Sequence, residues 1–243
     1  MRRLAIFVEG RTELLFIDRL IREVAERSQI AVHQRSIRGG GKSGSPRKYI
    51  EIQTPVLGND ESFYVLIVDC GGDHLVAQRV REEHQSLTNN GYDAVIGLRD
   101  VFPDFTKADV PRLRTMMRYG VRTKLIPVHF FLAVMEIEAW FLSEHNHFPL
   151  VDPAITVDAI HTNLGFNPEL DDMSARLEAA SDLNDAYQIG AKSYVKGDGR
   201  GTVDKLSYDY IYLSLRDRIP DLQGLLSVVD AFLGPPKGDA PVA

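Results

Sequence analysis

The sequence predicts an α/β protein in which a mostly parallel sheet is flanked by helices and followed by a C-terminal helical extension. First, strand-like and helix-like segments alternate through the first half of the chain, the pattern of right-handed βαβ units. Second, three apolar strand segments end in an acidic residue, at Glu9, Asp69 and Asp100. Third, only short helical segments are indicated beyond about residue 145. The sheet is therefore expected in the first part of the chain.

The opening segment Leu4–Val8 is a short apolar run that predicts a buried parallel strand, and Gly10 permits a tight turn after it. Thr12 is suited to cap the helix that follows, which is predicted over residues 13–27. Further strands are predicted over residues 30–37, 63–69, 94–98 and 124–134. Further helices are predicted over residues 74–88, 207–218 and 222–232.

The order of these segments predicts three parts of the chain. We expect an α/β domain over residues 1–145 and a helical extension packed on it over residues 146–232. Residues 233–243 are rich in glycine and proline and are expected to form a disordered tail. The 243 residues suffice to bury a sizeable core.

Composition narrows the class of protein. Hydrophobic residues make up 44% and charged residues 26%, as in ordinary soluble proteins. Cys70 is the only cysteine, which excludes an internal disulfide and a multi-cysteine zinc site. No apolar run is long enough to cross a bilayer and no secretory signal is indicated, so we expect a cytoplasmic enzyme of bacterial type without membrane contact. The net charge of −6 argues against a protein that coats nucleic acid, but it is compatible with a nuclease.

Acidic residues at the predicted strand ends indicate a metal site. The carboxyl ends of parallel strands meet at one edge of a sheet, so Glu9 and Asp100 are expected close together, with Glu13 one helical turn after Glu9. Glu136 and Glu138 follow another apolar strand, where acids are costly unless they are paired or bound to metal. If their segment is extended, both face one side, and if it is helical, only one reaches the site. Carboxylates suit Mg²⁺ or Mn²⁺.

Asp69 has two alternative roles. Its position at the end of the most apolar strand makes it a candidate metal ligand beside Glu9 and Asp100. The glycines at 71 and 72 also allow Asp69 to form a strand-end turn without any ion.

Two segments combine basic residues with glycine and are candidates for contact with a nucleic-acid backbone. The first contains Arg38, Lys42, Arg47 and Lys48. The second contains Lys192, Lys196 and Arg200, with Tyr194 available to stack on a base. If nucleic acid is the substrate, some of these residues are expected to form a strip beside the acids. The alternative is that both segments are solvated surface loops.

Three motifs resemble those of the TOPRIM domain, and together they are closest to the OLD-like nuclease branch. They are Val8-Glu9-Gly10-x-Thr12-Glu13, Leu98-Arg99-Asp100-x-x-Pro103 and Glu136-x-Glu138-Ala139-Trp140. The resemblance covers roughly residues 1–145 and points to a TOPRIM-like family of uncharacterised bacterial proteins. It implies a Rossmann-like sheet, a magnesium site and, by analogy, defence against phage or mobile DNA beside an ATPase partner. The Asp-x-Asp pair typical of TOPRIM domains is missing here.

The function expected from these features is a magnesium-dependent nucleic-acid phosphodiesterase. Glu9, Asp100, Glu136 and Glu138 would be the catalytic residues, and Glu9 would also act as general base. The metal ligands would come from Glu9, Glu13, Asp69, Asp100 and Glu138. One alternative is a non-catalytic effector or binding subunit that works with a partner ATPase. Another is a small-molecule phosphotransferase or hydrolase.

Overall fold

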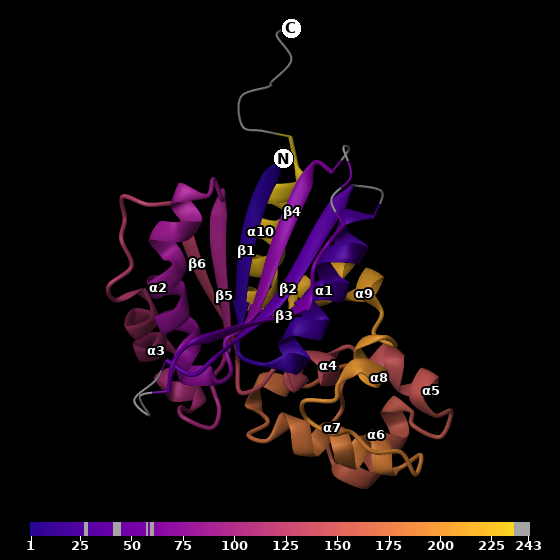
Figure 1. Ribbon diagram of the computed structural model, residues 1–243. Coiled ribbons are helices and arrows are strands. Elements are labelled where there is room, and N and C mark those ends of the chain that lie inside the picture. Colours follow the sequence, from indigo (N-terminus) through magenta and orange to yellow (C-terminus); the bar gives the residue numbers. More distant parts are fainter. Residues whose placement is uncertain (27–28, 41–44, 57, 59–60, 236–243) are drawn as a thin grey trace, which may run out of the picture.

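The structure is a computed structural model that describes residues 1–243 except 27–28, 41–44, 57, 59–60 and 236–243. It confirms the α/β class, with a mostly parallel sheet in the first part of the chain (Figure 1). The six strands lie in the order β3-β2-β4-β1-β5-β6. They are β1 (Arg2–Val8), β2 (Ile30–Arg38), β3 (Lys48–Gln53), β4 (Phe63–Asp69), β5 (Ala94–Asp100) and β6 (Val128–Ala133). Five strands run parallel, and β3 pairs antiparallel with β2 at one edge.

Helices cover both faces of the sheet because the strand residues are apolar on both sides. α1 (Arg11–Ala25) and α10 (Pro220–Leu233) pack on one face of the sheet, to which the side chains of Leu4 and Ile6 of β1 point. We call this side of the sheet the α1 face. α2 (Val76–Asn89) and α3 (Val110–Arg118) pack on the opposite face, the α2 face, to which Ala5 and Phe7 of β1 point. The alternation of β1 side chains therefore separates two apolar cores.

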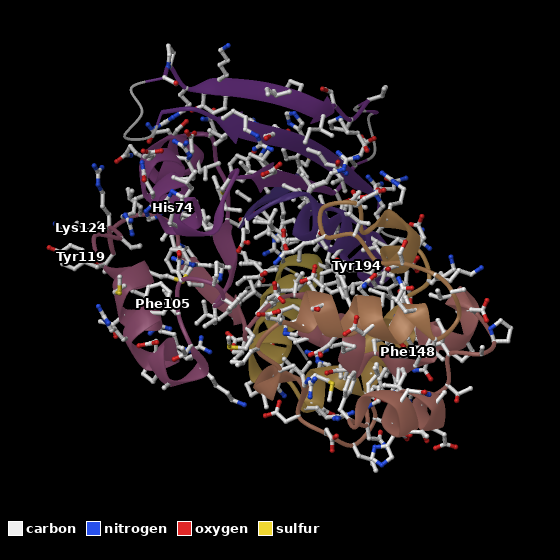
Figure 2. All side chains as sticks on the ribbon, turned by 90° about the horizontal axis from the view of Figure 1, so that it is seen from below. His74, Phe105, Tyr119, Lys124, Phe148 and Tyr194 are labelled. Atoms are coloured by element: carbon white, nitrogen blue, oxygen red, sulfur yellow. The ribbon has the colours of Figure 1, made fainter. Side chains whose placement is uncertain are left out.

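The helical extension shares the α1-face core with the sheet. Phe16 of α1 contacts Trp140, Phe141 and Tyr208, with ring centroids 6.1, 5.4 and 6.2 Å away. α4 (Glu138–Ser143) leads into the extension, which includes α5 (Phe148–Val151), α6 (Val157–Leu164), α7 (Ala179–Gln188), α8 (Arg200–Val203) and α9 (Tyr208–Leu213). In Figure 1 α4 to α8 gather below the carboxyl ends of the strands, α9 lies beside α1, and α10 returns to the sheet. Figure 2 shows the helices of the extension from below, with Phe148 among them. None of the helices in the described ranges has the length and apolarity that a membrane span requires.

Several expected elements differ in extent. The strand predicted over residues 124–134 is shorter, because β6 pairs with β5 only from Val128 onward. Two elements were not predicted, the edge strand β3, which is exposed along its whole length, and α3. The helix predicted over residues 207–218 is interrupted after Leu213 and ends in a 3₁₀ turn. Of the predicted tail, residues 236–243 lie outside the described residues, as does Lys42 of the basic loop.

The strand order places a topological switch point between the carboxyl ends of β1 and β5. From β1 the chain passes through α1 on one face to β2, and from β5 it passes through α3 on the other face to β6. Neighbouring strands whose connections leave in opposite directions form the switch point at which α/β sheets bind ligands. Glu9 and Asp100 lie at this point.

Gly97 tests the packing of the central strand β5. A Cβ at this position would lie 2.6 Å from Cδ1 of Phe130 and 3.3 Å from Val76. We expect Gly97→Ala to lower the free energy of unfolding by about 1–3 kcal/mol through overpacking. Gly201→Ala is the control, because a Cβ there meets nothing within 4 Å. Urea denaturation of both variants measures the effect, and equal stabilities would contradict the packing at β5.

Candidate metal centre

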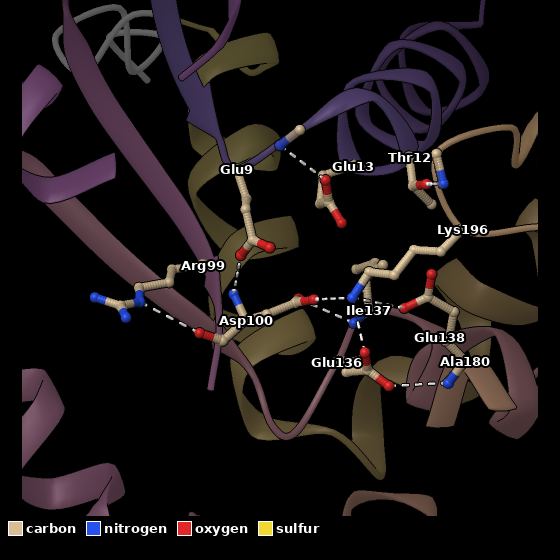
Figure 3. Close-up of polar contacts among 12 residues, drawn as sticks. Glu9, Thr12, Glu13, Arg99, Asp100, Glu136, Ile137, Glu138, Ala180 and Lys196 are labelled. Carbon is tan, nitrogen blue, oxygen red and sulfur yellow. Dashed lines mark hydrogen bonds and ion pairs between the residues drawn. The ribbon is translucent and has the colours of Figure 1, made fainter. Parts of the chain in front are cut away.

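Three carboxylates meet where β1 and β5 end. Glu9 follows β1, Glu13 lies in the first turn of α1, and Asp100 ends β5 (Figure 3). Each offers one oxygen atom, and these oxygens all lie within 4.8 Å of one another. All three residues are buried. The predicted convergence of Glu9, Glu13 and Asp100 at one edge of the sheet is therefore present.

Local hydrogen bonds fix this first group. Gly10 takes an extended conformation before α1, and its backbone N–H donates to Oε2 of Glu13 at 3.0 Å. The backbone N–H of Asp100 donates to Oε2 of Glu9 at 3.0 Å across the neighbouring strand ends. Asp100 lies on the same side of β5 as the apolar Ile96 and Leu98, so its side chain points to the α1 face.

Glu136 and Glu138 form a second group with Asp100, whose three oxygens also lie within 4.8 Å of one another. Neither expected geometry, fully extended or fully helical, describes their segment. β6 ends at Ala133, Met135 has a φ of 50°, and α4 begins at Glu138. The turn directs both acids into the site, and the N–H of Ile137 donates to Oδ1 of Asp100 at 3.0 Å.

Lys196 places its ammonium among the acids of the second group. Its Nζ lies 2.7 Å from Oε1 of Glu136, 3.4 Å from Oδ2 of Asp100 and 4.0 Å from Oε2 of Glu138. Figure 3 shows the long side chain entering the site from the right, between the acids of the two groups. A contact between Lys196 and a nucleic-acid phosphate was predicted, whereas the structure brings this residue into contact with carboxylates.

Residues on both sides of Lys196 anchor it, and we call residues 194–197 the strap. The hydroxyl of Tyr194 donates to Oε1 of Glu138 at 2.5 Å, and the N–H of Gly197 donates to Oγ1 of Thr12 at 3.0 Å. Tyr194 is only 7% exposed, so the expectation that its ring stacks on a nucleic-acid base is wrong in this structure. No local sequence signal links the strap to α1 and α4, because the contacts span long stretches of chain.

Burial and mutual repulsion disfavour the charged forms of these acids. Burial, followed by the neighbouring Glu138 carboxylate, raises the pKa of Glu13 to about 7. Burial and the Glu13 carboxylate raise the pKa of Asp100 well above its ordinary value. Burial opposes the charged form of Lys196, but the carboxylates of Asp100, Glu138 and Glu136 outweigh it and raise the pKa of the ammonium. The site as a whole favours the binding of positive charge.

The donor set fits a hard divalent cation. Every side chain in the two groups offers carboxylate oxygen, the ligand type that Mg²⁺ and Mn²⁺ prefer. Oε2 of Glu138 is buried and accepts no hydrogen bond from the described residues. A buried carboxylate oxygen without a hydrogen-bond donor is costly, and the positive charge beside it in this structure is the ammonium of Lys196, 4.0 Å away.

Asp69 does not join either group, which corrects its prediction as a metal ligand. Its carboxylate accepts two bonds from Arg38, at 2.7 and 3.1 Å, and one from the hydroxyl of Ser36 at 3.3 Å. The N–H of Gly71 donates to Oδ1 of Asp69 at 2.9 Å. The strand-end turn therefore holds, with an arginine from the neighbouring strand β2 as the counterion.

The other predicted nucleic-acid contacts are scattered. Arg47 pairs with Glu82 of α2 at 2.6 Å, and Lys48 begins the edge strand β3. Lys192 lies 3.7 Å from Asp152, and the exposed Arg200 begins α8. Of the predicted basic residues in the described part of the chain, Lys196 alone pairs with the acids, so the structure shows no strip beside them.

Comparison with known proteins finds neither a matching family model nor a matching curated protein. The chain is similar to a crystal structure described as the "putative cell surface hydrolase" of Lactobacillus plantarum WCFS1, with a TM-score of 0.32 and 12% identity. The alignment covers 56% of this chain and about half, 53%, of that one. A likeness this weak carries no argument about function, which must come from the site.

Glu13 gives the metal-free protein a pH dependence. Because its pKa rises from 4.5 to about 7 on folding, the native state binds the extra proton between these values, and stability falls as pH rises through that window. Glu13→Gln should abolish this component, so the variant gains on the order of 1–3 kcal/mol over wild type between pH 4.5 and pH 8.

Urea denaturation in EDTA at several pH values measures the difference. Glu23→Gln, on the exposed face of the same helix α1, is the control and should follow wild type. The assignment fails if wild type and Glu13→Gln share one pH profile.

Proposed function

We propose that the protein is a magnesium-dependent phosphodiesterase acting on nucleic acid, of the TOPRIM-like type that its motifs resemble. The observation that carries the proposal is the first group of acids, because Glu9, Glu13 and Asp100 offer three buried oxygens within 4.8 Å at the switch point of the sheet. Sites of this composition suit Mg²⁺, which phosphodiester hydrolysis uses to orient water and neutralise the leaving oxygen.

In the proposed reaction the acids and Lys196 have different roles. Glu9, Glu13 and Asp100 hold the cation, which supplies Lewis-acid stabilisation and an activated water when bound. The Glu9 carboxylate, oriented by the N–H of Asp100, accepts the proton of the attacking water. Lys196, whose side chain is 41% exposed, presents an ammonium beside the site that can meet a phosphate oxygen.

A cavity beside the strap supports a nucleic-acid substrate. It has a volume of about 480 Å³ and is lined by Lys192, Lys205 and Tyr194, whose hydroxyl contacts Glu138 of the site. Lys192 of this cavity lies 3.7 Å from Asp152, whereas Lys205 bonds to the carbonyl of Gly201 and is the basic side chain there that a further phosphate of a polyanion would neutralise. By resemblance to the OLD-like branch, the proposal extends to a role in defence against phage or mobile DNA with an ATPase partner.

One observation favours a second candidate, the non-catalytic effector subunit. Lys196 pairs with Glu136 and Asp100, and such a pairing also occurs in structural ion-pair networks that bind no metal. In that case the acids hold the strap in place, and the strap-bearing extension would present a surface to a partner protein.

Glu9→Gln separates the two candidates. The change removes a charge while the amide oxygen can still accept the N–H of Asp100, so we expect the fold to survive. Cleavage of plasmid DNA, RNA and oligonucleotides in Mg²⁺ or Mn²⁺ should fall about 100-fold or more, as for a lost general base. The magnesium-induced rise in melting temperature should also shrink.

Glu169→Gln, at an exposed position in the extension, is the matched control and should retain full activity. If wild type shows no metal-dependent cleavage, or Glu9→Gln cleaves as well as wild type, the catalytic proposal is wrong and the effector role is favoured.

Lys196→Met tests whether the ammonium of Lys196 takes the place of a second metal ion among the acids. Lys196 stands where a cation would bind to Asp100, Glu136 and Glu138, so wild type should bind one Mn²⁺ in the first group. Removal of the ammonium leaves the second group open, and the variant should bind a second ion.

Electron paramagnetic resonance of free Mn²⁺ during titration counts the ions, and Lys205→Met is the control, because it removes a lysine that does not contact the acids. Equal stoichiometry in wild type and Lys196→Met would contradict the assigned role of the ammonium.

A further inference from the structure

The α2 face carries a second cavity that the metal site does not use. It has a volume of about 430 Å³, and its walls include Tyr49, Tyr64 and Tyr92 together with Arg3 and Arg35. We call it the tyrosine pocket. We propose that the tyrosine pocket binds a nucleoside phosphate, with the base against the tyrosine rings and the phosphate on the two guanidiniums.

The pocket exists because the α2 face is covered unevenly. α2 packs over β1 and β5, whereas β4, β2 and β3 extend beyond it (Figure 1). Side chains of these strands, such as Leu66 of β4, form the floor, and α2 forms one wall. The hydroxyl of Tyr49 donates to Glu83 of α2 at 2.7 Å, which closes the pocket at the side of the edge strand β3.

Arg35 lies in the pocket without an anionic partner. Among the described residues its guanidinium makes no ion pair or hydrogen bond, and its Nε is buried. Its Cζ stands 5.9 Å from the ring centroid of Tyr49. Only the Nε is buried and the side chain as a whole is half-buried, so the two terminal nitrogens have no partner among the described residues and remain open to an anion that enters the pocket.

Arg3 adds a second guanidinium to the pocket, and the one acid among its described lining residues is already paired. Arg3 lies 5.9 Å from the ring centroid of Tyr64, with its Nη1 held by the carbonyl of Asn90 at 3.0 Å. Glu83 is the acid of the lining within the described residues, and it already contacts Tyr49 and, at 3.5 Å, Arg47. The pocket therefore presents net positive charge to a ligand.

A chain of hydrogen bonds orders the tyrosines. Glu51 of β3 bonds to Nε2 of His33, whose Nδ1 lies 2.6 Å from the hydroxyl of Tyr64, and the ring of Tyr64 meets that of Tyr92 edge to face with centroids 6.3 Å apart. Burial raises the pKa of Tyr92 to about 12, so its hydroxyl stays neutral, and the nearby Arg35 opposes the rise. Rings held in this way form a preorganised surface against which a planar base can stack.

The shape and chemistry together select the ligand class. A volume of about 430 Å³ lies within the usual range for small-molecule sites. Arginine forks bind phosphate, and aromatic rings stack on nucleobases of any type. From Arg3 to Glu9 the strand β1 spans roughly 20 Å, and the acids lie toward the opposite face, so the pocket is distinct from the metal centre.

Calorimetric titration of the protein in EDTA tests the proposal without any metal ion. The probes are the four nucleoside 5′-monophosphates, the matching nucleosides and inorganic phosphate. We expect the monophosphates to bind and both halves to bind much more weakly. Arg35→Gln should weaken monophosphate binding about 10-fold or more, as expected for the loss of a charged contact, and Arg35→Lys should recover part of it.

Two further variants make the result unambiguous. Ser86→Trp changes an exposed residue of α2 at the pocket mouth and should block binding without disturbing the core. Arg216→Gln is the matched control, since Arg216 also lies over a tyrosine, at 4.9 Å from the Tyr212 ring, but outside the pocket. The proposal is overturned if no monophosphate binds wild type at millimolar concentration. It is also overturned if Arg35→Gln or Ser86→Trp binds like wild type, or if inorganic phosphate binds as tightly as the monophosphates.

Discussion

The burial of five carboxylates at the end of the sheet is the constraint on which the rest of the structure depends. Each is at most 8% exposed, and the group comprises Glu9, Glu13, Asp100, Glu136 and Glu138. Like charges withdrawn from water repel one another and lose hydration, so the arrangement persists only with protons or cations that offset the charge. Lys196 supplies one positive charge to this group. The negative charge that remains is of the kind that a bound divalent cation would offset.

The same constraint accounts for the position of the helical extension. Lys196 reaches Asp100 only because the strap is anchored to Thr12 in α1 and to Glu138 in α4. If the extension were released from the sheet, the acids would lose their ammonium and Glu138 would lose the hydroxyl of Tyr194. The second half of the chain is thus part of the site, which agrees with the apolar core that it shares with the sheet.

The part of the site that follows from local sequence and strand direction was predictable. Glu9 and Asp100 end apolar runs, and parallel strands bring such ends together. Asp69 also ends an apolar run, yet its carboxylate pairs with Arg38, which lies on the neighbouring strand β2. Sequence spacing does not reveal which strands are neighbours, so this partner could not be predicted. The strap lies in a segment that mixes basic residues with glycine as surface loops do, so its entry among the acids depends on tertiary contacts alone. β3 was missed although Ile50-Glu51-Ile52-Gln53 alternates apolar and polar residues, which is the pattern of a strand.

The missed strand is also what gives the sheet two faces of opposite electrostatic character. Tyr49 of β3 completes the tyrosine pocket with its two guanidiniums, while the carboxylates gather toward the other face at the strand ends. An anion approaching the metal-free protein is repelled at the acids and attracted at the pocket. A cation bound among the acids offsets part of their charge and so weakens the first of these preferences, and it leaves the second unchanged. Binding of a polyanion at the strand ends should therefore depend on the metal, whereas occupation of the tyrosine pocket should not.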